Sequence, residues 1–368
     1  MPTQVEVAQD RVVEVFNRML VPERLHPGAQ LAVYRHGECV VDLASGYSDA
    51  QACSLVLPNT PFPLISAGKP FGAVAVLQQV EAGRLGFDEP VATYWPAFGA
   101  NGKERVLVRH LLSHRGGFPQ FPEGVDWLGM RDSGTMIPAI EQMPALYPPG
   151  LALAYHHLTQ QWACLELVRR VDGRPFAEYM SDMVTAPLGM ANTYFGVSES
   201  LESRVARLHA MEPIDPFLSD IVLRFNARES HASQAPLFAV STARDMARFY
   251  AAILAGGSLD GQRVLTAEVV EEALRVEVEP EVDRVTDTRA SWSLGFQLSG
   301  AVAPEERPFG STSTARTFGH SGGGTVVSWA DRDLDLAMCF VSNGQNSLEA
   351  NLQRRHVISN AVRSLVGA

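Results

Sequence analysis

Two groups of short alternating strands, one near each end of the chain, constrain the fold more than any other feature. The first group, Gln30–Tyr34 and Cys39–Leu43, is separated by a turn that contains Gly37. The second group, Thr325–Trp329 and Asp335–Val341, is joined by a short acidic turn. Alternating apolar runs joined by such turns are typical of antiparallel hairpins. The simplest arrangement is therefore one antiparallel sheet built from both ends of the chain.

The remainder of the chain predicts helices around and between these hairpins. The first 20 residues read as an amphipathic helix, and the last predicted helix runs over 352–365. We expect an α+β fold in which an antiparallel sheet is flanked by terminal helices and carries a large, mainly helical insertion domain. The predicted division is 1–65 and 285–368 for the sheet domain and 66–284 for the helical domain, with the active site in the cleft between them.

Composition excludes several classes of function. The net charge is −11 and no cluster of Lys or Arg is present, which disfavours nucleic acid and membrane surfaces as partners. No apolar stretch reaches membrane-spanning length, and the N-terminus lacks the basic and apolar regions of a signal peptide. The four cysteines are scattered without C-x-x-C spacing, so we expect free thiols, a cytoplasmic protein and no zinc site. Self-association into a homo-oligomer stays open.

The stretch Ile65–Phe71 is the first candidate for chemistry. Three prolines precede it between residues 58 and 63, and an apolar, helix-compatible segment follows it. A helix should therefore begin near Ser66, with Pro70 tolerated in its first turn. Residues three apart share a helical face, so Ser66 and Lys69 should point the same way, beside a helix N-terminus that favours negative charge. A hydroxyl and a potential base at such a place outline an acyl-transfer site, although an N-cap serine beside a solvated lysine has the same spacing.

Two further segments add polar groups. Tyr155-His156-His157 follows a Pro-Gly turn and precedes the strong helical pattern that starts at Leu158. His320 lies ahead of the glycines Gly322–Gly324 at the start of a predicted strand. Adjacent glycines allow the backbone to approach a ligand and present N–H donors.

These three segments, in this order, resemble a known superfamily. Ser66-x-x-Lys69 resembles the S-x-x-K motif of the serine β-lactamases and penicillin-binding proteins. Tyr155-His156-His157 resembles the Tyr-x-Asn element, and His320-Ser321-Gly322 the Lys-Thr-Gly or His-Thr-Gly element. The spacing is similar to the class C-like branch, which includes the family VIII carboxylesterases. The likeness covers nearly the whole chain. It extends to the segments between the motifs, such as Pro187-Leu188-Gly189-Met190 and Val108–His114.

The resemblance implies a role for each residue. Ser66 would attack a carbonyl and become acylated, while Lys69, with a lowered pKa, and Tyr155 would accept its proton. Tyr155 would then protonate the leaving group and activate water, and His320 would orient Tyr155. The backbone N–H groups of Ser66 and Gly323 would form the oxyanion hole. No metal or cofactor is implied.

Two departures from the lactamase pattern bear on the substrate. His157 stands where lactamases usually have a substrate-binding asparagine, and His320 replaces a lysine that helps to hold the β-lactam carboxylate. Both favour a serine carboxylesterase that acts on small to medium esters through an acyl-enzyme on Ser66. Five residues are expected to bind this small-molecule substrate: His157, Gly322, Phe118, Phe121 and Trp127.

The same residues are also compatible with other functions. An acyltransferase, an amidase or D-aminopeptidase, or a weak β-lactamase could use the same site, and a non-catalytic binding protein could retain the fold. Gly319-His320-Ser321-Gly322-Gly323 also fits the G-x-S-x-G elbow of α/β-hydrolases. That motif requires a helix after the serine, whereas a strand pattern follows here, so Ser321 is not expected to be the nucleophile.

Overall fold

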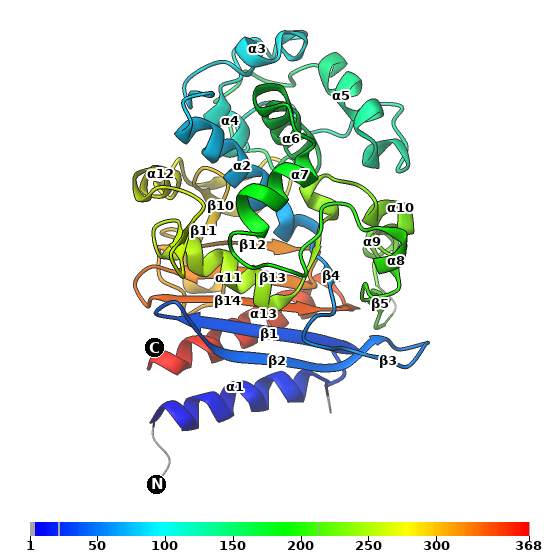
Figure 1. Ribbon diagram of the computed structural model, residues 1–368, viewed down its shortest axis with the longest axis vertical. Coiled ribbons are helices and arrows are strands. Elements are labelled where there is room, and N and C mark those ends of the chain that lie inside the picture. Colours follow the sequence, from blue (N-terminus) through cyan, green and yellow to red (C-terminus); the bar gives the residue numbers. More distant parts are fainter. Residues whose placement is uncertain (1–3, 21–22, 213, 368) are drawn as a thin grey trace.

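The computed structural model describes residues 4–20, 23–212 and 214–367, and an antiparallel sheet of nine strands organises it (Figure 1). The strand order is β3-β2-β1-β14-β13-β12-β11-β10-β9. Each neighbouring pair is antiparallel. The strands are β1 Gly28–Arg35, β2 Glu38–Asp49, β3 Ser54–Leu55, β9 Val278–Val282, β10 Arg289–Trp292, β11 Gln297–Leu298, β12 Thr317–Gly322, β13 Val326–Asp331 and β14 Leu336–Ser342.

The two predicted hairpins are confirmed and meet at the centre of the sheet. β1 pairs with β2 on one side and with β14 on the other, so that Leu31 lies opposite Phe340. β13 and β14 form the second hairpin across the turn after Asp331. The ends of the chain are thereby joined in one sheet, as the alternating pattern predicts.

The terminal helices cover one face of this sheet. α1 (Gln4–Leu20) and α13 (Leu348–Arg363) lie on the same side (Figure 1). Alternate sheet residues such as Leu31, Trp329 and Phe340 pack there with Phe16 and Ile358. The intervening residues of the same strands point to the opposite face, because successive side chains on a strand alternate.

α11 (Ala243–Leu254) covers the opposite face of the sheet. Its Met246 and Tyr250 are buried in the large core with Ala32 and Cys339 of the central strands. Both α11 and β9 belong to the segment 66–284 that was expected to form the helical domain. The boundary expected at 285 falls inside the β9–β10 hairpin. The amphipathic pattern of α11 predicts a helix with one apolar face, but it does not reveal that this face packs on the sheet.

The helical region above the sheet is built around α2 (Lys69–Glu81), which packs against α6 (Thr159–Asp172). Every residue of α2 from Lys69 to Gln79 is buried, so this helix has no solvent-facing stripe. None of the helices in the described part of the chain is long and apolar enough to cross a membrane. The other α-helices are α3 Val91–Tyr94, α4 Val108–Leu112, α5 Ser133–Gln142, α7 Phe176–Met180, α8 Glu199–Glu202, α9 Pro216–Phe225, α10 Arg228–His231 and α12 Ala267–Ala273.

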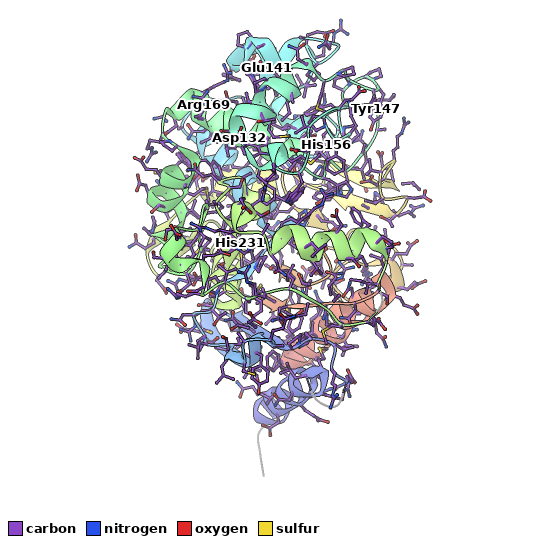
Figure 2. All side chains as sticks on the ribbon, turned by 90° about the vertical axis from the view of Figure 1, so that its right-hand side faces the viewer. Asp132, Glu141, Tyr147, His156, Arg169 and His231 are labelled. Carbon is purple, nitrogen blue, oxygen red and sulfur yellow. The ribbon has the colours of Figure 1, made fainter. Side chains whose placement is uncertain are left out.

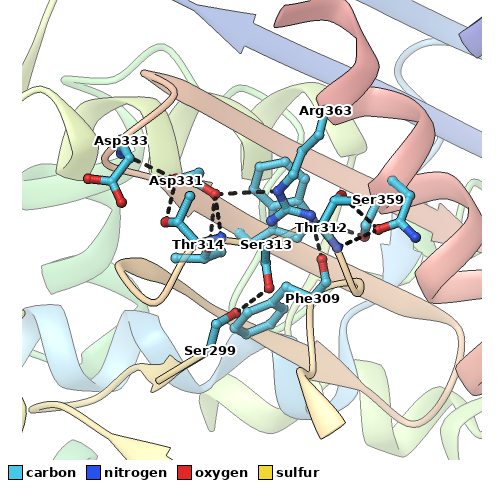
Figure 3. Close-up of polar contacts among 12 residues, drawn as sticks. Ser299, Phe309, Thr312, Ser313, Thr314, Asp331, Asp333, Ser359 and Arg363 are labelled. Atoms are coloured by element: carbon cyan, nitrogen blue, oxygen red, sulfur yellow. Dashed lines mark hydrogen bonds and ion pairs between the residues drawn. The ribbon is translucent and has the colours of Figure 1, made fainter. Parts of the chain in front are cut away.

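A buried ion pair ties α13 to the sheet (Figure 3). Arg363 and Asp331 are both fully buried, and Nε of Arg363 lies 3.3 Å from Oδ2 of Asp331. The same carboxylate accepts hydrogen bonds from the hydroxyls of Thr314 and Thr317. The guanidinium also stacks on Trp329, 3.8 Å from the ring centroid. These contacts offset the cost of burying the charge pair, although Nη2 of Arg363 has no partner among the described residues.

Candidate active site

A short turn of 3-10 helix, η1 (Ile65–Gly68), leads into α2 and presents Ser66 and Lys69 together. Ser66 is half-buried and Lys69 is 2 % exposed. Nζ of Lys69 lies 3.5 Å from Oγ of Ser66. The turn is closely packed, since a Cβ on Gly68 would lie 2.0 Å from the carbonyl oxygen of Pro236. The predicted helix start is confirmed, and it brings the hydroxyl and the amine to one face.

Lys69 has no carboxylate partner among the described residues. Its Nζ donates a hydrogen bond of 2.6 Å to the carbonyl oxygen of His157 and lies 5.2 Å from the ring centroid of Tyr155. Burial disfavours the charged ammonium and lowers the pKa of Lys69 to about 7. A substantial fraction of the lysine is therefore a neutral amine near neutral pH, which can accept a proton from Ser66.

Tyr155 is held between the helical region and the sheet. Its backbone N–H donates to Oδ1 of Asp283 at 3.1 Å, and its hydroxyl lies 3.4 Å from Nε2 of His320. Burial raises the pKa of Tyr155, while a hydrogen bond from Ser66 acts in the opposite direction. The phenol is consequently protonated in the resting site, and Lys69 is the better base.

His320 faces Tyr155 from β12. Its Nδ1 donates to the carbonyl oxygen of Ser321 at 2.7 Å, and burial lowers its pKa to about 3. A neutral imidazole with its proton on Nδ1 offers Nε2 as an acceptor, which suits the hydroxyl of Tyr155. The contact expected between His320 and Tyr155 is therefore present in the structure.

Aromatic and imidazole rings enclose this group. Tyr155 packs against His114 at 4.6 Å and His157 at 4.8 Å between ring centroids, and Trp292 packs on His114 at 4.4 Å. Burial lowers the pKa of His114 and also that of His157, to about 4. The imidazoles are neutral at physiological pH, so they add bulk around Lys69 without adding a charge.

His156 belongs to the same enclosure from the side of the helical region (Figure 2). Its Nδ1 donates to the carbonyl oxygen of Ala154, and its ring packs on Phe118. Despite the number of imidazoles, no group of three or more metal-ligating side chains in the described residues is arranged to hold a metal ion.

The glycine turn after β12 lies directly against η1. A Cβ on Gly322 would lie 2.1 Å from the carbonyl oxygen of Leu64, and one on Gly323 would lie 2.5 Å from Cδ1 of Ile65. Gly323 has φ of +52°, a conformation that glycine adopts readily. Only glycine permits this approach, which brings the turn against the residues on either side of Ser66.

Ile65 is a strained residue that sequence reasoning missed. It precedes Ser66 and has φ of +51°, although it is β-branched and 5 % exposed. A left-handed conformation is rare for such a residue and is retained only where its surroundings enforce it. The side chain of Ile65 packs against Gly323, so the strain lies between the two backbone segments expected to bind an oxyanion.

A cleft of about 1080 Å³ opens onto these groups. Its walls include Ser66, Tyr155, His157, His320 and Gly323, together with the predicted binding residues Phe121 and Trp127. Phe121 stacks on His157 with 6.1 Å between the ring centroids. One part of the wall is apolar. The segment after Phe121 contributes Trp127 and Met130, and α9 contributes Phe217, Leu218, Ile221 and Phe225. Leu158, just before α6, and Leu237 complete it.

Two predicted binding residues lie outside the cleft. Phe118 is fully buried and packs edge-on against Phe98, with 5.4 Å between ring centroids, so it is a core residue. Gly322 faces Leu64 and Ala67, so its contribution is the close backbone approach. Conversely, Trp292 and Asp283 contact the ring or the backbone of Tyr155 and lie outside every motif of the sequence. His114 also packs on Tyr155 and ends the segment Val108–His114, which resembles the family but carries no expected site role.

Comparisons with known proteins identify the family and the fold. The β-lactamase family model matches residues 15–363. The esterase/β-lactamase LipL of Mycobacterium tuberculosis is 29% identical over 360 residues, which cover 90% of this chain and 80% of LipL. A family VIII carboxylesterase structure superimposes with a TM-score of 0.85 at 26% identity and covers 97% of both chains. A penicillin-binding protein homologue from Caulobacter crescentus superimposes with a TM-score of 0.83 at 28% identity, over 96% of this chain and 97% of the homologue.

Proposed function

Because the chain belongs to the β-lactamase family, we propose that it is a serine carboxylesterase that cleaves small to medium esters through an acyl-enzyme on Ser66. It is a hydrolase of the β-lactamase and esterase superfamily. The observation that carries the finer proposal is the buried Lys69, which lies 3.5 Å from the Ser66 hydroxyl and has no carboxylate partner among the described residues.

In the proposed acylation, the neutral amine of Lys69 takes the proton of Ser66 while Oγ attacks the ester carbonyl. The resulting oxyanion is stabilised by the backbone N–H groups of Ser66 and Gly323. Tyr155 donates its proton to the departing alkoxide and regains one from the protonated Lys69. Collapse of the tetrahedral intermediate breaks the C–O bond, releases the alcohol and leaves the acyl group on Ser66.

Deacylation uses the same groups in reverse. Water gives a proton to the Tyr155–Lys69 pair and attacks the acyl carbon, and Ser66 regains its proton as the carboxylic acid departs. His320 stays neutral and keeps the phenol aligned through its Nε2 acceptor. An alcohol or amine could replace water at this step, which is the acyltransferase alternative.

An ester is favoured over a β-lactam by the side chains at two positions. The neutral imidazole of His320 stands where lactamases have a lysine, and it supplies no positive charge at physiological pH. The ring of His157 stacks on Phe121 and is not an amide donor. Family VIII carboxylesterases are also among the proteins of similar fold, and the esterase EstB of Burkholderia gladioli is 32% identical over 220 residues, 55% of this chain.

The decisive experiment is pre-steady-state hydrolysis of p-nitrophenyl butyrate. We expect a burst of one p-nitrophenolate per active site, and a mass increase of one butyryl group in acid-quenched protein. Peptide mapping should locate that group on Ser66 and not on Ser321. Ser66→Ala should abolish burst and label, whereas the distant, exposed Ser200→Ala should retain both. Absence of label on Ser66 in the wild-type protein would favour a non-catalytic role.

A further inference from the structure

Tyr155, the proposed acid–base residue, lies on a segment without regular structure. Residues 152–156 belong to neither a helix nor a strand, and α6 begins only at Thr159. Such a backbone has no ladder of hydrogen bonds of its own, so contacts from other segments must hold it. The position of the phenol therefore depends on the groups that bind the backbone around Tyr155.

His114 binds this segment on both sides of Tyr155. Its carbonyl oxygen accepts a hydrogen bond from the backbone N–H of Ala154, and its Nδ1 accepts one from the backbone N–H of His156, both at 3.1 Å. The N–H between these two, that of Tyr155 itself, donates to Asp283. The imidazole of His114 also packs on the phenol ring, with 4.6 Å between ring centroids. A single residue thus holds Tyr155 through its two neighbours and through its ring.

The backbone of His114 has a conformation that favours glycine. His114 follows α4, and the N–H of Arg115 donates to the carbonyl oxygen of His110, as in a Schellman helix end. The left-handed residue of such an end is usually glycine. His114 has φ of +59° and is 1 % exposed. The helix end alone therefore does not account for an imidazole at this position.

The imidazole also carries a buried donor without an acceptor. Because Nδ1 accepts from His156, the single proton of the neutral ring must lie on Nε2. Nε2 is sealed from solvent and has no hydrogen-bond partner among the described residues. Burial lowers the pKa of His114 well below its ordinary value, so the ring stays neutral. The unpaired donor and the left-handed backbone both oppose stability, and residues of this kind cluster at functional sites.

His114 is placed to act on Tyr155 and not on a substrate. Among the described residues, Tyr155 and Trp292 line the cleft and His114 does not. The ring of Trp292 packs edge-on against the imidazole, with 4.4 Å between ring centroids. Any influence of His114 on the reaction must therefore pass through the position of its neighbours.

We propose that His114 is a positioning residue that acts through Tyr155, by holding the backbone on both sides of the phenol where proton transfer requires it. This inference rests on the proposed esterase function, in which Tyr155 protonates the leaving alkoxide. A proton is transferred efficiently only within hydrogen-bond reach, and a misplacement of about 1 Å can lower turnover by about 10²-fold. The side chain of His114 should therefore control kcat without touching the substrate.

Two substitutions separate the side chain of His114 from its backbone conformation. Glycine and asparagine both tolerate the left-handed region, but only asparagine places an acceptor near the position of Nδ1. We expect His114→Gly to lower kcat for p-nitrophenyl butyrate by about 10- to 100-fold with KM within a few-fold of the wild type. His114→Asn should recover most of this loss. Equal kcat values for the wild type and His114→Gly would overturn the proposal.

A cavity control is available in the same helix end. Leu112 is fully buried, and Leu112→Ala opens a cavity two residues before His114. It should lower thermal stability and leave kcat within a few-fold of the wild-type value. If Leu112→Ala lowered kcat as much as His114→Gly, the effect would be one of general packing and the proposal would fail.

A double-mutant cycle with Tyr155→Phe tests whether His114 acts through the phenol. Once the hydroxyl is absent, its position no longer matters, so His114→Gly should lower the residual kcat of Tyr155→Phe by less than about 3-fold. A purely structural role would lower kcat by the same factor in both backgrounds, and that outcome would contradict the proposal.

A measurement on the wild-type protein covers the cases in which the variants do not fold or no ester is turned over. In assigned spectra of ¹⁵N-labelled protein, Nδ1 of His114 should be unprotonated between pH 5 and 9. It should also show coupling to the amide nitrogen of His156 across the hydrogen bond. A protonated Nδ1, or no such coupling, would overturn the proposal. If the wild-type protein hydrolysed no ester while this hydrogen bond was present, the esterase function would fail and the hold of His114 on Tyr155 would stand.

Discussion

Nζ of Lys69 lies 2.6 Å from the carbonyl oxygen of His157, and this neutral dipole is the closest acceptor that the buried amine has. A carbonyl can orient an amine without supplying the negative charge that would keep it protonated. The arrangement thus separates two requirements of a general base, which must be held in position and must also be unprotonated. The second requirement is met by burial alone.

The pH dependence of turnover follows from this relationship. Catalysis needs neutral Lys69, so kcat/KM should rise with pH through a single limb at about pH 7. His157 and His320, with pKa values of about 4 and 3, should not contribute to that limb. The check is kcat/KM for a neutral ester between pH 5 and 9, and His157→Asn should retain the limb. If His157→Asn abolished the rise of kcat/KM near pH 7, the titrating group would be the imidazole of His157 and not Lys69.

Folding stability should respond to the same group. The folded-state pKa of Lys69 is lowered from 10.5 to about 7, so the unfolded chain binds more protons between these values. Stability should therefore rise with pH from about 7 towards 10, and Lys69→Met should abolish this part of the dependence. Urea titrations of both proteins at several pH values measure it. Parallel pH profiles for the two proteins would contradict a buried, neutral lysine.

Removal of the Tyr155 hydroxyl should affect chemistry more than structure. Tyr155→Phe keeps the ring contacts with His114 and His157 and loses the contact with His320. We expect kcat to fall by about 10²- to 10⁴-fold, the usual contribution of a positioned acid–base group. KM and thermal stability should change little. A kcat within a few-fold of the wild type would assign proton transfer to another group.

Ile65 should act by positioning the two backbone segments of the oxyanion hole. Ile65→Ala removes the side chain that packs against Gly323 and does not itself change the left-handed backbone before Ser66. We expect kcat to fall by up to about 10²-fold, since a small misplacement at the reacting centre is costly. KM for p-nitrophenyl butyrate should remain within a few-fold. Because the variant also creates a cavity, its thermal unfolding must be measured in parallel, and Val56→Ala provides a core control away from the cleft.

The ion pair between Asp331 and Arg363 should dominate the attachment of α13. Burial acts to raise the pKa of Asp331, but hydrogen bonds from Thr317 and Thr314 and the charge of Arg363 outweigh it and lower the pKa. The lowered value means that the pair stabilises the fold above the unfolded-state pKa of the carboxyl, and that this stability is lost as pH falls through the folded-state value.

Asp331→Asn should therefore destabilise the protein by about 3–5 kcal/mol, because it leaves the arginine buried without its anion. Replacing both partners, as in Asp331→Leu/Arg363→Met, should recover much of the loss. Urea unfolding of the three proteins at pH 7 tests this. Additive losses in the double variant would show that the two side chains do not act as a pair.

The local pattern of the sequence determined a large part of this protein. The period-two runs predict both hairpins, and the prolines before Ser66 predict a helix start that places Lys69 on the same face. The order of the three motif segments along the chain is sufficient to identify the superfamily. Each of these inferences depends on residues a few positions apart, whose geometry is set by backbone sterics and periodicity.

Tertiary packing decided the remainder. Phe118 lies in the core and not in the cleft, and Trp292 reaches Tyr155 from a strand more than 130 residues away in sequence. The neutrality of Lys69 depends on which groups surround it in space. Burial and the distance between charges are properties of segments brought together by folding, and no spacing along the chain encodes them.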